Sequence, residues 1–199
     1  MRSVIGAVLL ASALACIGNA GQAQTYQVFL SGLNEIPPNA SPGFGNGFVT
    51  LDPIGNTMRV QVAFNGLLGT TTAAHLHAAT ATAFTGNAGV ATTTPTFAGF
   101  PTGVTSGTYD NTLDMTVASS YNPAYITANG GTPASAESAL FSAIASGKSY
   151  LNIHTTVVPG GEIRGFLLAT PEPGSIALFL SLGVSVPLIA RRRRKVRNS

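Results

Sequence analysis

Apolar and polar side chains alternate along Met58-Arg59-Val60-Gln61-Val62-Ala63-Phe64. A period of two residues is typical of a β-strand with one buried face. Residues 113–117 alternate in the same way. Four more segments are short and rich in β-branched, aromatic or other apolar residues: 26–30, 48–51, 150–154 and 162–168. These patterns predict a mainly β chain.

Turn-forming residues separate the predicted strands, among them the glycine-rich run 43–47 and Pro159-Gly160-Gly161. Residues 69–107 are rich in threonine, alanine and glycine, and we expect short strands joined by long loops there. Many short strands with frequent turns favour an antiparallel Greek-key-like β-sandwich or flattened barrel over a parallel α/β sheet.

One short helix is expected at residues 133–146. Thr132 can cap its N-terminus, Pro133 suits the first helical position, and Gly147 can end it. Between these limits the apolar side chains recur at helical spacing, which predicts one buried stripe.

The N-terminus has the pattern of a secretory signal peptide. Arg2 precedes an apolar run from Val4 to Ile17, and small residues follow as far as Ala23. We therefore predict residues 1–23 as a signal that signal peptidase cleaves after Ala23. A membrane-spanning helix is the alternative, but the run has 14 residues and a span needs about 20. A lipoprotein signal ending before Cys16 is a second alternative, although the leucine usual three positions before the cysteine is missing.

The C-terminus, residues 171–199, combines three features in a fixed order. The motif Pro171-Glu172-Pro173 comes first, an uncharged apolar stretch fills residues 174–190, and a basic cluster follows at 191–195. Seventeen helical residues cover about 25 Å, enough for a short span. Arginines beyond a span stay in the cytoplasm, which places the preceding domain outside. A plain C-terminal anchor would explain these features as well.

This tail resembles the PEP-CTERM sorting signal of Gram-negative bacteria. The resemblance implies that a membrane exosortase recognises Pro171, Glu172 and Pro173 and processes the tail. It also implies a protein anchored transiently in the inner membrane and then carried to the outer surface or the extracellular matrix.

The charge of the chain changes sign once both ends are set aside. Residues 24–170 hold three cations, Arg59, Lys148 and Arg164, against six carboxylates, which leaves a net charge of −3. A basic patch for nucleic acid is therefore not expected. Cys16, the single cysteine of the sequence, lies in the predicted signal, so the exported domain would contain no disulfide.

Three segments between the ends resemble the CHRD domain, a family named for the extracellular animal protein chordin. The first joins residues 30–38 to the glycines at 43–47, the second leads from Asn65 to His77, and the third covers 147–165. The resemblance runs through most of the predicted domain, residues 24–170. It implies an extracellular β-domain without a settled biochemical activity.

All three histidines of the chain lie in the resembling segments. Side chains two residues apart in a strand share a face, so His75 and His77 should point together. A hairpin centred on Val158 would place His154 opposite Glu162, and Asn152 opposite Arg164, which should pair with a carboxylate. We expect the three imidazoles to cluster, turned outward or towards an open end of the sandwich.

This cluster leads to two hypotheses. In the first, His75, His77 and His154 bind zinc or copper, and Glu162 is a further ligand or the hydrogen-bond partner of one. His-x-His with a distant histidine faintly resembles copper–zinc superoxide dismutase, so a metal-dependent oxidoreductase is the enzymatic alternative. In the second, the histidines belong to a structural polar network.

The sequence shows no nucleophile elbow and no phosphate-binding loop. We therefore expect a non-enzymatic module at the cell surface or in the extracellular matrix. Its expected partners are exopolysaccharide or surface proteins, the membrane through residues 174–190 before processing, and no nucleic acid.

Overall fold

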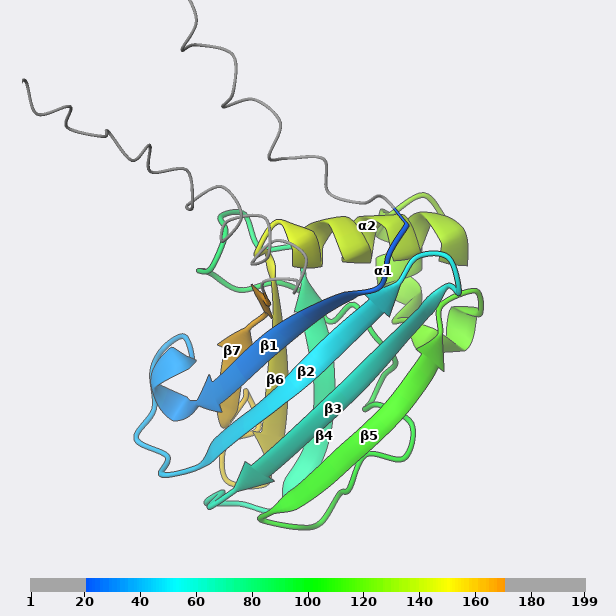
Figure 1. The fold of residues 1–199 in the computed structure, drawn as a ribbon. Coiled ribbons are helices and arrows are strands. Elements are labelled where there is room, and N and C mark those ends of the chain that lie inside the picture. Colours follow the sequence, from blue (N-terminus) through cyan, green and yellow to red (C-terminus); the bar gives the residue numbers. More distant parts are fainter. Residues whose placement is uncertain (1–20, 171–199) are drawn as a thin grey trace, which may run out of the picture. The chain divides into compact units, whose positions relative to one another are not determined.

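The computed structural model describes residues 21–170, which form one curled antiparallel sheet, a half-barrel, with short helices at one end (Figure 1). Strands follow the order β4-β6-β7-β1-β2-β3-β5, and β8 pairs with β1. The strands are β1 Gln24–Ser31, β2 Phe44–Asp52, β3 Thr57–Asn65, β4 Thr71–Ala78, β5 Gly107–Asp114, β6 Ser149–Thr155, β7 Ile163–Phe166 and β8 Leu168–Ala169. The α-helices are α1 Pro123–Ala128 and α2 Pro133–Ala145, and single 3₁₀ turns lie at η1 Gly32–Asn34 and η2 Ala118–Ser120.

The predicted fold class is confirmed. Figure 1 shows β1, β2, β3 and β5 in front of β4, β6 and β7. Between these two halves of the curled sheet lies an apolar core that includes Val60 of β3, Leu76 of β4 and Ile153 of β6. The alternation that predicted β3 is the burial pattern observed, since Met58, Val60, Val62 and Phe64 are all buried.

Helix α2 begins and ends almost where the sequence predicted. Thr132 accepts a hydrogen bond from the backbone of Ser135, whose side chain in turn accepts one from the backbone of Thr132, which completes a capping box. Helix α1 was not predicted. Asn122 caps it and Pro123 opens it, but six residues are too few to show a helical period.

Two predicted boundaries are wrong. The glycines at 43–47 do not form a turn, because β2 begins at Phe44 and pairs with β3 along its whole length. A Cβ on Gly47 would collide with the backbone oxygen of Gln61, so glycine serves close strand approach there. The strand predicted at 113–117 instead occupies Gly107–Asp114, where it pairs with β3.

The segment 79–106 seals the outer edge of β4. The hydroxyl oxygen of Thr92 accepts a hydrogen bond from Leu76 N at 3.0 Å, and that of Thr96 accepts one from Ala74 N at 2.9 Å. Backbone amides of the segment bond in return to the carbonyls of Leu76 and Ala74. Threonine side chains thus satisfy an edge that would otherwise expose unpaired amides.

The predictions for residues 1–20 and 171–199 lie outside the described residues. This includes most of the signal peptide, the sorting motif and the apolar stretch 174–190. Within residues 21–170, no helix is long and apolar enough to cross a membrane.

Replacing Thr92 by valine tests the edge seal. The change keeps the shape but leaves the buried Leu76 amide without its acceptor, so the free energy of unfolding should fall by about 1–3 kcal/mol. Urea denaturation measures this fall. Thr112→Val, on the exposed face of β5, is the matched control and should change stability by less than about 0.5 kcal/mol.

Candidate metal centre

The pairing of β4 with β6 places the histidines on one face of the sheet. His75 lies opposite Asn152, Ala73 opposite His154, and His77 opposite Tyr150. Opposite residues of an antiparallel pair share a face, with Cβ atoms about 5 Å apart. This face is the one turned away from the core residues Leu76 and Ile153.

The three imidazoles converge, which confirms the predicted cluster. One nitrogen from each of His75, His77 and His154 lies within 4.8 Å of the other two. The ring centroids are 4.8 Å apart for His75 and His154, 5.3 Å for His75 and His77, and 6.0 Å for His77 and His154. Two neighbouring strands therefore bring together residues that are nearly 80 positions apart in sequence.

A backbone carbonyl holds the far side of each ring. His77 Nδ1 donates to Ala88 O at 2.8 Å, and His154 Nδ1 donates to Pro159 O at 2.9 Å. The backbone of Pro95 bonds to His75, and a proline backbone offers only a carbonyl. Since a carbonyl only accepts, the ring nitrogen facing it must carry the hydrogen.

The remaining ring nitrogens are free acceptors. His75 Nδ1, His77 Nε2 and His154 Nε2 are buried, and none has a hydrogen-bond partner within residues 21–170. A neutral imidazole bonded through one nitrogen presents a lone pair at the other. This is how metal-binding histidines are held, with the second ring nitrogen bonded to a carbonyl or carboxylate.

The surroundings keep the rings neutral. Burial lowers the pKa of His75 to about 3, and the nearby rings of His154 and His77 lower it as well. Burial likewise lowers the pKa of His77 to about 4, despite its bond to Ala88, and lowers the pKa of His154. Imidazole in its neutral form is the form that binds a metal ion.

The histidines lie on the face turned away from the core, as expected, but two of the rings are covered instead of exposed. His75 is 6% exposed and His77 is 8% exposed. The segment 79–106 crosses this face and supplies the carbonyls of Ala88 and Pro95. The sequence of this segment shows no periodicity that would place it over β4.

Glu162 does not lie with the histidines. Its carboxylate accepts hydrogen bonds from the hydroxyls of Ser41 and Thr155 and from the amides of Leu68 and Gly69. Burial alone would raise the pKa of Glu162, but these donors lower it below its usual value. Glu162 therefore connects the loop at Ser41 and the loop at residues 68–69 to the end of β6. It does not lie opposite His154, where a regular hairpin would place it.

The departure from a regular hairpin has a local cause. The regular pairing of β6 with β7 ends at Ile153 and Ile163, although Asn152 does lie opposite Arg164 as predicted. Gly161, with φ +128°, precedes Glu162, whose amide donates to Ile153 O. The chain turns there, and the Glu162 side chain lies with Thr155 instead of His154.

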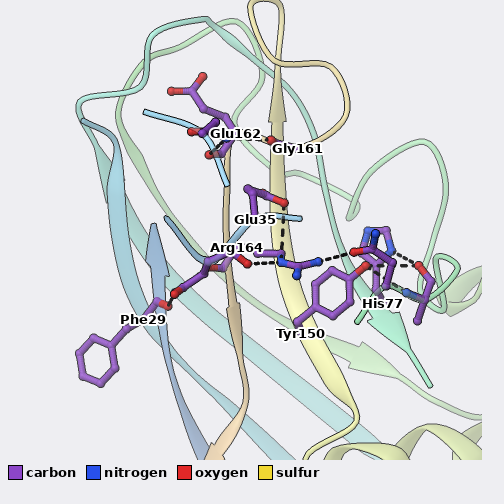
Figure 2. Close-up of polar contacts among 11 residues, drawn as sticks. Phe29, Glu35, His77, Tyr150, Gly161, Glu162 and Arg164 are labelled. Atoms are coloured by element: carbon purple, nitrogen blue, oxygen red, sulfur yellow. Dashed lines mark hydrogen bonds and ion pairs between the residues drawn. The ribbon is translucent and has the colours of Figure 1, made fainter. Parts of the chain in front are cut away.

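A stack of side chains supports the ring of His77. Tyr150 lies parallel to it, with centroids 4.7 Å apart, and the guanidinium of Arg164 is 4.6 Å from the Tyr150 ring centroid (Figure 2). Arg164 is itself fully buried and donates to Asn34 O at 2.5 Å and to Asn87 Oδ1 at 2.7 Å. The sequence analysis gave Tyr150 no role beyond its place in the predicted strand 150–154.

The carboxylate partner of Arg164 is Glu35, with Nε and Oε2 3.7 Å apart. Burial raises the pKa of Glu35 to about 7, while the charge of Arg164 acts in the opposite direction. Sequence reasoning predicted that Arg164 would have a carboxylate partner but could not identify it. Residues 35 and 164 are 129 positions apart in the sequence, so no local pattern links them.

The sequence model of the CHRD domain matches residues 26–167, which cover both histidine-bearing strands. The chain belongs to the CHRD domain family. The CHRD domain is an extracellular-type β-domain of uncertain function. No curated protein and no solved structure matches the chain.

Three neutral imidazole donors suit zinc or copper. Zinc–nitrogen bonds of about 2.0–2.1 Å put tetrahedral ligand nitrogens about 3.3 Å apart. The observed separations reach 4.8 Å, so the nitrogens would have to draw together by up to about 1.5 Å to bind one zinc ion.

Replacing Glu162 by glutamine separates its structural role from a ligand role. An amide NH₂ would face the amides of Leu68 and Gly69 or the hydroxyls, so the free energy of unfolding should fall by about 2–3 kcal/mol. Zinc affinity, measured well below the melting temperature, should stay within a factor of two. Asp110→Asn, in an exposed ion pair with Arg59, is the control and should cost under about 1 kcal/mol. A large loss of zinc affinity in Glu162→Gln would return Glu162 to the ligand set.

Proposed function

We propose that this CHRD domain is an exported module that binds one zinc or copper ion through His75, His77 and His154. The observation that carries the proposal is the set of three buried ring nitrogens without a partner in residues 21–170, on clustered rings of which two donate to backbone carbonyls through their other nitrogen. The rings are neutral, their free nitrogens are buried, and they already lie together, so a cation needs only to draw these nitrogens closer.

A purely structural polar network explains the cluster less well. Such a network pairs donors with acceptors, whereas these three nitrogens are all acceptors, and none has a partner in the described part of the chain. A buried polar atom without a partner costs about 1–3 kcal/mol. A metal ion would satisfy all three at once.

The proposal includes export and sorting. It is supported by the predicted signal, residues 1–23, and by the tail at 171–199 with its motif, apolar stretch and basic end. An exosortase-type enzyme would act on the Pro171-Glu172-Pro173 motif, because proline disfavours regular structure that would hide it from a protease. We propose a binding or structural role at the surface, with exopolysaccharide or surface proteins as partners.

Metal titration of the full-length protein in detergent, stripped with a chelator, tests the binding proposal. We expect one equivalent of zinc or copper. His75→Ala, His77→Ala and His154→Ala should each weaken binding at least 100-fold because each removes a ligand, while Asp110→Ala should not. Equal weak binding by wild type and all three variants would contradict the proposal.

We predict that the metal affinity measured in this titration depends only weakly on pH. Free imidazoles, with a pKa near 6.5, lose metal as protons compete below that value. The lowered pKa values of His75 and His77 keep their lone pairs available as the pH falls from 7 to 5. Affinity should fall less than tenfold over this range. A steep loss centred near pH 6.5 would show that the rings are solvated instead.

The sorting proposal predicts that the tail is removed. Intact mass spectrometry of protein released from or exposed on cells should give a chain lacking residues 174–199. Pro171→Ala combined with Pro173→Ala should leave the tail on the protein. Retention of the tail on most wild-type molecules would mean that the chain is a plain membrane-anchored protein.

A further inference from the structure

Two more buried oxygens lack a partner in the described part of the chain, and one of them belongs to the residue opposite His75. Asn152 Oδ1 and Glu35 Oε1 are buried and, among the described residues, neither has a hydrogen-bond partner. Asn152 is 3% exposed and lies directly opposite His75, between His75 on β4 and Arg164 on β7. Asn152 therefore lies between the histidine cluster and Arg164, the residue that pairs with Glu35.

The side chains of Asn152 and Glu35 both lie against Gly161. A Cβ on Gly161 would lie 2.6 Å from Asn152 Nδ2, 2.8 Å from Asn152 Oδ1 and 2.9 Å from Glu35 Oε1. The amide group and the carboxylate oxygen therefore border the same small space, which a side chain at position 161 would fill. The amide nitrogen is a donor and the carboxylate oxygen is an acceptor, so the two are complementary.

We propose that Asn152 Oδ1 is the fourth ligand of the metal ion, and that Glu35 orients it by accepting a hydrogen bond from Asn152 Nδ2. This inference rests on the proposed three-histidine site. Zinc in a closed site takes four ligands in a tetrahedron, and the amide oxygen is the neutral donor placed next to His75. The structure shows no such bond, so metal binding would bring Nδ2 to Glu35 Oε1 and leave the amide oxygen for the ion.

Glu35 is suited to act as a positioning residue because it is itself fixed. Arg164 lies 3.7 Å from its Oε2, which leaves Oε1 on the side of Gly161 and Asn152. Arg164 is held in turn by Asn34 O, Asn87 and the ring of Tyr150 (Figure 2). Partners outside the ligand set typically orient ligands in this way, and their loss costs about 10–100-fold in metal affinity.

The ligand set has a consequence for metal choice. Three imidazoles and one amide oxygen are all neutral, and none is a thiolate or thioether. Soft Cu(I) prefers sulfur donors, whereas Zn²⁺ and Cu²⁺ accept nitrogen and oxygen together. The divalent ions should therefore bind more tightly than Cu(I).

Substitutions at Asn152, read out with zinc affinity and with the visible spectrum of bound Co²⁺, test the inference on the full-length protein. Asn152→Leu keeps the volume but removes the oxygen, so zinc affinity should fall 10–100-fold and the cobalt bands should shift. Asn152→Asp supplies an anionic oxygen and places a like charge beside Glu35 that a cation relieves. Its zinc affinity should rise at least tenfold. Asn111→Leu, on β5, is the matched control and should change neither readout.

Glu35→Gln tests the positioning role. The variant keeps the shape but weakens the acceptor, so zinc affinity should fall about 3–10-fold and the cobalt bands should shift in the same direction as in Asn152→Leu. A purely structural role for Glu35 would lower the melting temperature without moving the cobalt bands.

Each outcome bears on the inference. If His77→Ala abolishes binding but Asn152→Leu and Asn152→Asp match wild type in affinity and spectrum, the fourth ligand is not Asn152, and the three-histidine site stands. If wild type binds no metal, both proposals fail. If Asn152→Leu does not fold, as thermal melting would show, the near-isosteric Asn152→Asp decides, and unchanged affinity in that variant overturns the inference.

Discussion

The antiparallel pairing of β4 with β6 is the constraint on which the candidate site depends. Its register puts His75 opposite Asn152 and His77 opposite Tyr150, and it leaves His154 two residues further along the same face. A shift by one residue would turn all of these polar groups into the core and expose Leu76 and Leu151. The apolar residues that hold the register therefore also fix the positions of the imidazoles.

Local patterns in the sequence were enough for the parts of the fold that depend on local rules. The alternation at 58–64 gave β3, and Thr132 with Pro133 gave the start of α2. The i, i+2 spacing predicted that His75 and His77 share a face, and the hairpin placed Asn152 opposite Arg164. These inferences succeeded because strand and helix geometry alone determine them.

The failures all involve contacts that a linear pattern does not encode. The glycines near 45 resemble a turn, but their role is the close approach of β2 to β3. Glu162 was placed by assuming a regular hairpin, and one glycine with positive φ redirected it. Glu35 and Asn87 reach Arg164 from loops, and Ala88 reaches His77 from a loop, so only the tertiary structure brings these residues together.

The segment that seals the edge of β4 is also the segment that covers the histidines. Ala88 and Pro95 bond to two of the rings, while Thr92 and Thr96, between and beside them, bond to the amides of β4. Exposing the histidine cluster to solvent therefore requires breaking the hydrogen bonds along the edge of β4. An ion held there would exchange slowly whatever its equilibrium affinity, so the ion would be loaded as the chain folds, which under the proposed export happens outside the cytoplasm. Which metal the protein carries would then be set by the compartment in which it folds.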